Sequence, residues 1–136
     1  MILAARQLGW AHSTPSGQEG KRGDRTRSEI VRDNGGDVEM PGQSCPHMYE
    51  WFIQAGPSLP GAMGAVPLDA RELAAWSQLS GVDLLPWEFA ALRDASRAYC
   101  SELNKAADWP PYGDSEALYD DDVVAEKLAR GLERLT

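Results

Sequence analysis

Residues Pro67–Lys105 read PLDARELAAWSQLSGVDLLPWEFAALRDASRAYCSELNK, and this stretch decides the fold. It predicts two helices, at about residues 70–80 and 86–105, joined by a tight turn. In the second helix, large apolar side chains recur at spacings of three, four and seven, which is the helical period. The members of this stripe are Leu85, Phe89, Leu92, Tyr99 and Leu103. The sequence therefore predicts an αα-hairpin at the centre of an all-α fold.

The ends of both helices are marked by residues with specific backbone roles. Asp69 can cap the first helix, and Glu72, three residues later, can complete a capping box. Gly81 suits the left-handed position that ends a helix. Pro86 suits the first turn of the next helix, where its missing N–H costs nothing. In the second helix, the small residues Ala95 and Ala98 would let another helix approach closely.

Two further helices are expected on either side of the hairpin. HMYEWFIQA, residues 47–55, would place Met48, Trp51 and Phe52 on one helical face. A strand is the alternative for this segment, because aromatic residues and Ile also favour strands. Proline and glycine make 56–66 a predicted loop. A charge-graded C-terminal helix is expected at about 120–135, after a proline-rich linker.

The N-terminal region looks poorly suited to packing. Residues 11–46 are dominated by glycine, proline, serine and charges, so they offer little apolar surface to offset the entropy of ordering. Residues 1–10 could form a short helix, with nothing obvious to hold it in place. The sequence thus predicts a disordered or loosely ordered lead-in over 1–46, a helical domain over 47–107, and a linker with a C-terminal helix over 108–136.

Charge is distributed unevenly along the chain. The net charge is −8; residues 48–136 carry seven basic and fifteen acidic residues, whereas the first 47 are balanced. An acidic surface repels phosphate backbones and anionic membranes, and it favours solubility or a basic protein partner. We expect no nucleic acid and no membrane as partner. No apolar run approaches the roughly 20 residues that span a bilayer, and the expected location is the cytoplasm.

Residues that could carry chemistry are few. His12 and His47 are the two histidines that could act as a base, and no nucleotide-binding or nucleophile motif is present. Cys45, His47 and Cys100 do not follow the spacing of a zinc site. Adjacent aspartates at 120–122 point in different directions on a helix, so they are interpreted as partners of the helix dipole. We expect no enzyme activity, no metal and no cofactor.

The predicted hairpin also raises the possibility of a helix-turn-helix regulator that binds DNA. The glycine in the turn and the second helix fit this motif loosely. However, the second helix begins PWEFAALRDA, and its early positions offer an acid and bulky apolar groups. Arginine, lysine, asparagine or glutamine would be needed there to read bases.

Aromatic side chains are the remaining functional signal. Tryptophan is common both in cores and at interface hot spots, so the role of Trp87, off the main stripe, is open. It either caps the hairpin turn or stands exposed as an anchor for a partner. The candidate partner-binding residues are Trp87, Trp109, Tyr112, Trp51 and Phe52.

Several of these residues recur in a longer pattern. It consists of Tyr49-x-Trp51-Phe52, Glu72-Leu73-x-Ala75-Trp76-x-x-Leu79-x-Gly81-Val82-x-Leu84, Pro86-Trp87-Glu88-x-x-x-Leu92 and Arg97-Ala98-Tyr99. The pattern resembles a small family encoded in the tail gene clusters of tailed phages and prophages, described as tail assembly chaperones or related tail-cluster proteins. The resemblance covers about Met48–Leu103. Related sequences tend to carry Leu-Asp where this chain has Ala95 and Ser96, so a role of that carboxylate does not carry over.

The resemblance implies a helical, non-enzymatic protein that covers apolar helices of the tape measure protein until the tail tube assembles. Such a protein would act in the host bacterial cytoplasm, alone or as a homo-oligomer. The alternatives are a minor structural protein that stays in the virion tail and the small helix-turn-helix regulator considered above. A chaperone of this kind needs apolar surface to hold its client and net charge to stay in solution.

Overall fold

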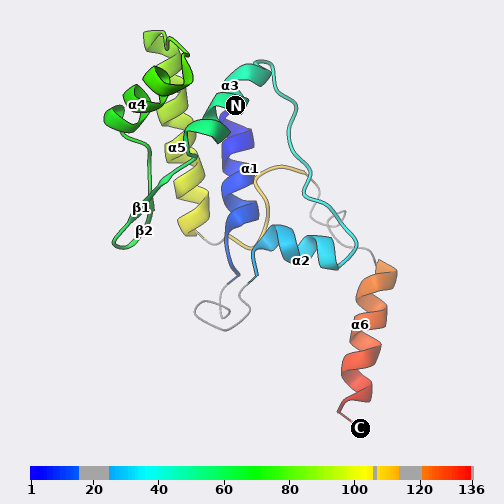
Figure 1. The fold of residues 1–136 in the computed structure, drawn as a ribbon. Helices are drawn as coiled ribbons and strands as arrows, with labels where there is room; N and C mark the ends of the chain where they lie inside the picture. Colours follow the sequence, from blue (N-terminus) through cyan, green and yellow to red (C-terminus); the bar gives the residue numbers. More distant parts are fainter. Residues whose placement is uncertain (16–24, 106, 114–120, 136) are drawn as a thin grey trace.

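The computed structural model describes residues 1–15, 25–105, 107–113 and 121–135. The described chain is mostly helical, with a small two-stranded sheet (Figure 1). Its elements, in order, are α1 (Ile2–His12), α2 (Arg27–Asp33), α3 (Pro46–Ala55), β1 (Leu59–Gly61), β2 (Gly64–Val66), α4 (Ala70–Ser80), α5 (Pro86–Lys105) and α6 (Asp121–Glu133).

The predicted hairpin is confirmed with its boundaries. The Asp69 carboxylate accepts a hydrogen bond from the Glu72 N–H at 2.9 Å and so caps α4. Gly81 follows the helix with a φ of 75°, the left-handed conformation that glycine adopts without a steric penalty. Pro86 begins α5, and the Glu88 carboxylate accepts a hydrogen bond from the Leu85 N–H at 2.8 Å. These local signals are sufficient to fix the turn.

The segment at 47–55 is a helix, as preferred over a strand, but the following segment is not a plain loop. β1 and β2 pair antiparallel, with Leu59 opposite Val66, so the all-α prediction is wrong at this point. The fully buried Ser96 hydroxyl accepts from the Leu68 N–H and donates to the Pro57 carbonyl oxygen. This one side chain on α5 therefore fixes both ends of the β-hairpin.

The largest correction concerns the N-terminus. The structure contradicts the predicted disorder of the lead-in, because α1 is ordered and lies beside α5 at the centre of the molecule (Figure 1). Gly9 makes the close approach possible: a Cβ on this residue would lie 2.3 Å from the Tyr99 carbonyl oxygen. Ala5 and Ala95 are both fully buried in the shared core. The prediction that the small residue Ala95 lets another helix approach closely is thus confirmed, and the approaching helix is α1.

Polar contacts hold α1 to segments far away in sequence. Gln7 is fully buried; its amide nitrogen donates to the carbonyl oxygens of Glu39 and Tyr112, and its amide oxygen accepts from the Tyr112 N–H. The Trp10 indole donates to the Ala107 carbonyl oxygen at 2.9 Å. Buried polar groups in proteins are nearly always hydrogen-bonded, as these are. The 107–113 segment is therefore anchored along α1.

The short helix α2 closes the lower end of α1. A capping box joins Thr26 and Glu29 at the start of α2. The Arg27 guanidinium lies 5.4 Å from the centre of the Trp10 ring and donates to the Ser13 hydroxyl. Residues 16–24 of the predicted disordered region lie outside the described residues.

The core mostly follows the predicted stripe on α5. Leu92 is fully buried and Tyr99 nearly so, together with Leu73 of α4 and Phe52 of α3. Leu85 is more than half exposed, which corrects its assignment to the buried stripe. The stripe fails at Leu85 because α5 begins at Pro86, so Leu85 belongs to the turn.

Helix α6 forms close to the predicted position and stands apart from the body in the view of Figure 1. Three leucines on one of its faces, Leu128, Leu132 and Leu135, are 64 to 83 % exposed. The side chains of the aspartates at 121 and 122 lie outside the described part, so their predicted role at the helix dipole is not tested.

Candidate protein-binding groove

An apolar groove lies between the two hairpin helices and extends to the turn that joins them. It has a volume of about 400 Å³ and is lined by Ala70, Leu73, Ala74, Ser77, Leu84, Pro86 and Phe89. Small side chains on α4 leave room above Leu73, which lies at the floor and is fully buried. A concave, mostly apolar surface between helices is a common form of peptide-binding site.

The local sequence explains why this groove stays open. The tight turn after Gly81 is held by the Ser77 hydroxyl, which donates to the Val82 carbonyl oxygen. That bond keeps the last turn of α4 close to the chain that enters α5. The alanines at 70 and 74 are too short to fill the space that remains between the helices. The hollow is thus a consequence of small residues on α4 opposite Phe89.

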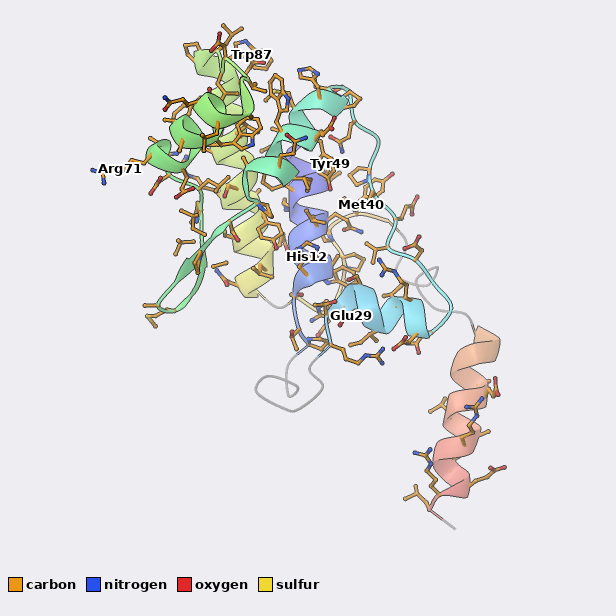
Figure 2. The ribbon with its side chains drawn as sticks, in the orientation of Figure 1. His12, Glu29, Met40, Tyr49, Arg71 and Trp87 are labelled. Atoms are coloured by element: carbon orange, nitrogen blue, oxygen red, sulfur yellow. The ribbon has the colours of Figure 1, made fainter. Side chains whose placement is uncertain are left out.

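Large apolar side chains surround the turn beside this groove. Trp87 is 57 % exposed, and Leu79 and Leu85 are exposed as well. Figure 2 shows Trp87 at the outer end of the hairpin. Trp87 is therefore not part of the core, and its role as an anchor for a partner stays a prediction. Exposed large apolar side chains near one turn are a feature of many protein interaction sites.

One cationic side chain lies against Phe89, which lines the groove. The Arg93 guanidinium lies 5.7 Å from the centre of the Phe89 ring, which lines the groove. Its Nε atom is buried and has no hydrogen-bond partner in the described chain. A buried donor without a partner is costly, so an acceptor brought by a bound chain would be favoured there.

The other candidate residues do not join Trp87. Phe52 is fully buried in the core, so we remove it from the candidate surface. Trp51 is half-buried between His47 and Trp76, with ring centres 5.0 and 6.3 Å away, and it links α3 to α4. Trp109 is 68 % exposed but lies beyond the C-terminal end of α5.

Tyr112 belongs to the anchored segment along α1. Its backbone is held by Gln7, and its side chain is half-buried. Sequence reasoning found the exposed tryptophans but missed the groove itself. Small residues at 70 and 74, one turn apart on a helix that faces a phenylalanine, were the signal that could have indicated it.

A second hollow, of about 320 Å³, lies between α1, α2 and residues 37–40. It is lined by Leu8, Ala11, His12, Ser28, Arg32, Asp37, Val38 and Met40. The His12 Nδ1 atom and the Tyr99 hydroxyl are 2.7 Å apart, so one histidine nitrogen is already engaged with α5. Partial burial of the imidazole lowers the pKa of His12. Burial, and secondly the neighbouring Cys100, raise the pKa of Tyr99.

Potential metal ligands are not brought together in the described residues. Cys45 is exposed before α3, whereas Cys100 is buried on α5. Across the described ranges, no three His, Cys, Asp or Glu side chains are grouped so that they could hold a metal ion. Within the same ranges, no helix combines the length and the apolar character needed to cross a membrane.

We compared the chain with models of known protein families, with curated proteins and with solved structures, and none of them matches. The features that indicate a function are the groove, the exposed apolar side chains and the charge of the chain.

Proposed function

We propose that the chain is a non-enzymatic tail assembly chaperone or accessory protein of a tailed phage or prophage, whose α4–α5 groove holds an apolar helix of the tape measure protein. The observation that carries the proposal is the open apolar groove beside the exposed side chains of Leu79, Leu85 and Trp87. An amphipathic helix would lay its apolar face into such a groove. The pattern resemblance supplies the identity of the client.

The acidic charge of the chain indicates which kind of helix it would bind. Because residues 48–136 carry fifteen acidic and seven basic residues, a helix with lysine or arginine beside its apolar face complements this surface. The same negative charge keeps a protein with exposed apolar side chains in solution. The client is thus an amphipathic, basic helix, held during assembly in the host cytoplasm.

The test is co-expression with the tape measure protein that the proposal names as client, followed by pull-down and a binding titration. Trp87→Ala should weaken binding at least tenfold, as expected for an interface hot spot. The control is Trp109→Ala, which removes an equally exposed indole far from the groove and should leave binding unchanged. Both variants should keep the wild-type helicity.

Two results would contradict the proposal. One is the absence of any association between the wild-type proteins, together with normal tails after deletion of the gene. The other is equal loss of binding in both tryptophan variants, which would place the contact outside the groove.

Mass spectrometry of purified virions distinguishes a chaperone, which should be absent from the particle, from a minor structural tail protein, which should be present. A mobility shift at low salt tests the DNA-binding alternative, because electrostatic binding is strongest there.

A further inference from the structure

The second hollow, between α1, α2 and the segment after α2, has the features of a small-molecule site. Its volume of about 320 Å³ is at the lower end of the roughly 300–1,000 Å³ of such sites, so a ligand that fills it is small. Leu8, Ala11 and Val38 supply apolar lining, and Arg32 and Asp37 supply one charge of each sign. Apolar lining with a few convergent polar groups is the usual composition of a ligand site.

The turn after α2 brings these two charges to the same hollow. The helix ends in a Schellman motif. In it, the Gly35 N–H donates to the Arg32 carbonyl oxygen and the next N–H donates to the Val31 carbonyl oxygen, both at 3.0 Å. Gly35 has a φ of 85°, the left-handed conformation that this motif requires. The chain therefore folds back over the end of α2 and places Asp37 on the hollow that Arg32 also lines.

Neither charge is neutralised by a neighbouring side chain. Among the described residues, the Arg32 guanidinium has no ion-pair partner. The Asp37 carboxylate accepts a hydrogen bond from the Val38 N–H at 2.9 Å through Oδ1, and its Oδ2 atom has no partner in the same part of the chain. The two groups line one hollow and yet do not pair with each other. A small ligand with a charge of each sign would supply a partner for both.

The walls of the hollow are held in place without a ligand. The buried Gln7 amide donates to the Glu39 carbonyl oxygen at 2.9 Å and so fixes the segment after α2 against α1. On the α1 side, the His12 Nδ1 atom lies 2.7 Å from the Tyr99 hydroxyl, which fixes the imidazole ring. Because burial lowers the pKa of His12, this ring adds no charge at pH 7, and the hollow keeps one charge of each sign. A preformed site avoids part of the entropy cost of binding.

We propose that this hollow binds a free α-amino acid with an apolar side chain. Arg32 binds the carboxylate through charge-assisted hydrogen bonds, Asp37 binds the α-ammonium group, and the side chain lies on the apolar lining at Leu8 and Ala11. The two charged groups of an α-amino acid are attached to one carbon, which matches two opposite charges on one small hollow. The end of a peptide carries only one of these groups and would leave the other protein charge unpaired. The site is independent of the α4–α5 groove and of any client.

The experiment is isothermal titration calorimetry of the full chain with three matched probes. They are L-leucine, isocaproate, which lacks the ammonium group, and isoamylamine, which lacks the carboxylate. L-Leucine should bind at least tenfold more tightly than either of the other two, and L-methionine and L-phenylalanine test the size of the apolar part. If none of the three amino acids gives saturable binding, the proposal is overturned. Equal affinities for L-leucine and isocaproate, or for L-leucine and isoamylamine, would overturn it as well.

Two variants assign the two ends of the ligand. Arg32→Gln should raise the dissociation constant of L-leucine at least tenfold and leave that of isoamylamine unchanged. Asp37→Asn keeps an acceptor for the backbone N–H and should weaken L-leucine binding while leaving isocaproate unchanged. Both positions are exposed, so the fold is retained. The controls, Arg97→Gln and Asp94→Asn, remove exposed charges on α5 that do not line the hollow and should change no affinity. Equal losses in the control variants would overturn the proposal.

Discussion

Helix α5 is packed in opposite ways against α1 and α4. Towards α1, the helices approach backbone to backbone at Gly9 and Tyr99, and Ala5, Gln7, Ala95 and Tyr99 are buried. Towards α4, small residues leave a groove of about 400 Å³. The closed side gives the fold its stability, and the open side leaves apolar surface available for another helix. A substitution on the α1 side should therefore lower stability, whereas a substitution on the α4 side should weaken the binding of another helix.

Long-range polar contacts also hold α1 in place, both to α5 and to the 107–113 segment. The Arg6 guanidinium donates to the buried Glu102 carboxylate at 2.9 Å, and Gln7 and Trp10 bind backbone groups of the 107–113 segment. Such contacts stabilise one arrangement of the helices, because each buried group would otherwise lack a partner. The open side shows the opposite situation, in which Arg93 still lacks an acceptor for its Nε–H.

The largest effect is expected from Trp10→Ala. This change removes a buried indole from the cluster with Val31 and breaks the hydrogen bond to Ala107, so it should lower the free energy of unfolding by about 3–5 kcal/mol. The matched change on the open side, Trp87→Ala, should stay within about 0.5 kcal/mol of the wild type. Urea unfolding followed by circular dichroism measures both. Equal losses would show that Trp87 is packed as tightly as Trp10, which lies in the buried cluster with Val31.

An intermediate effect is expected from Gly9→Ala. The new methyl group would overlap the Tyr99 carbonyl, so the helices must separate, and overpacking of this kind costs about 1–3 kcal/mol. Gly131→Ala is the control: nothing lies within 4 Å of its position, and alanine favours the helix by up to about 1 kcal/mol. The same unfolding experiment should show a loss for the first variant and no loss for the second. A neutral Gly9→Ala would exclude the close approach of α1 to α5.

The smallest effect is a dependence of stability on pH. The pKa of His12 lies below its ordinary value of 6.5 because burial disfavours the charged imidazole. The unfolded chain therefore binds a proton at His12 more readily than the folded chain does. The free energy of unfolding should be highest above pH 6.5 and should decline as the pH falls below that value. Unfolding midpoints measured between pH 7.5 and 5 should show this decline, and His12→Gln should reduce it. An unchanged slope in His12→Gln would assign the pH dependence to other groups.

The parts of the fold that local signals determine could be predicted from the sequence. Asp69, Gly81 and Pro86 mark the ends of α4 and α5, and their roles depend on neighbours within four residues. The same holds for the helical spacing of Met48 and Phe52 in α3, both of which are buried. A short-range rule was enough in each of these cases.

The role of α1 could not be predicted because its partners are remote. The acceptors of the Gln7 amide are 32 and 105 residues away, and the contact of Gly9 is with the backbone of Tyr99. In the sequence, Gln7 and Gly9 interrupt an apolar pattern and suggest weak packing. The β-hairpin was missed for a similar reason, since Ser96 fixes it from 28 and 39 residues away.

The candidate site was predicted in part. For Trp87, the sequence left open whether the indole caps the hairpin turn or stands exposed. It could not decide because both outcomes depend on how α4 and α5 diverge. Phe52 and Trp51 are adjacent aromatic residues, yet one is in the core and the other is half-buried. The face that each presents follows from the position of α3 over α5, which no local pattern specifies.

Residue-resolved hydrogen exchange of the full chain tests most directly the claim that α1 and α5 form one closed core. The slowest amides of both helices should exchange with the same free energy of opening and should respond alike to low concentrations of denaturant, as one cooperative unit. Exchange of the α1 amides at the rate of an unstructured chain, with α5 still protected, would contradict the account and would restore a disordered N-terminus.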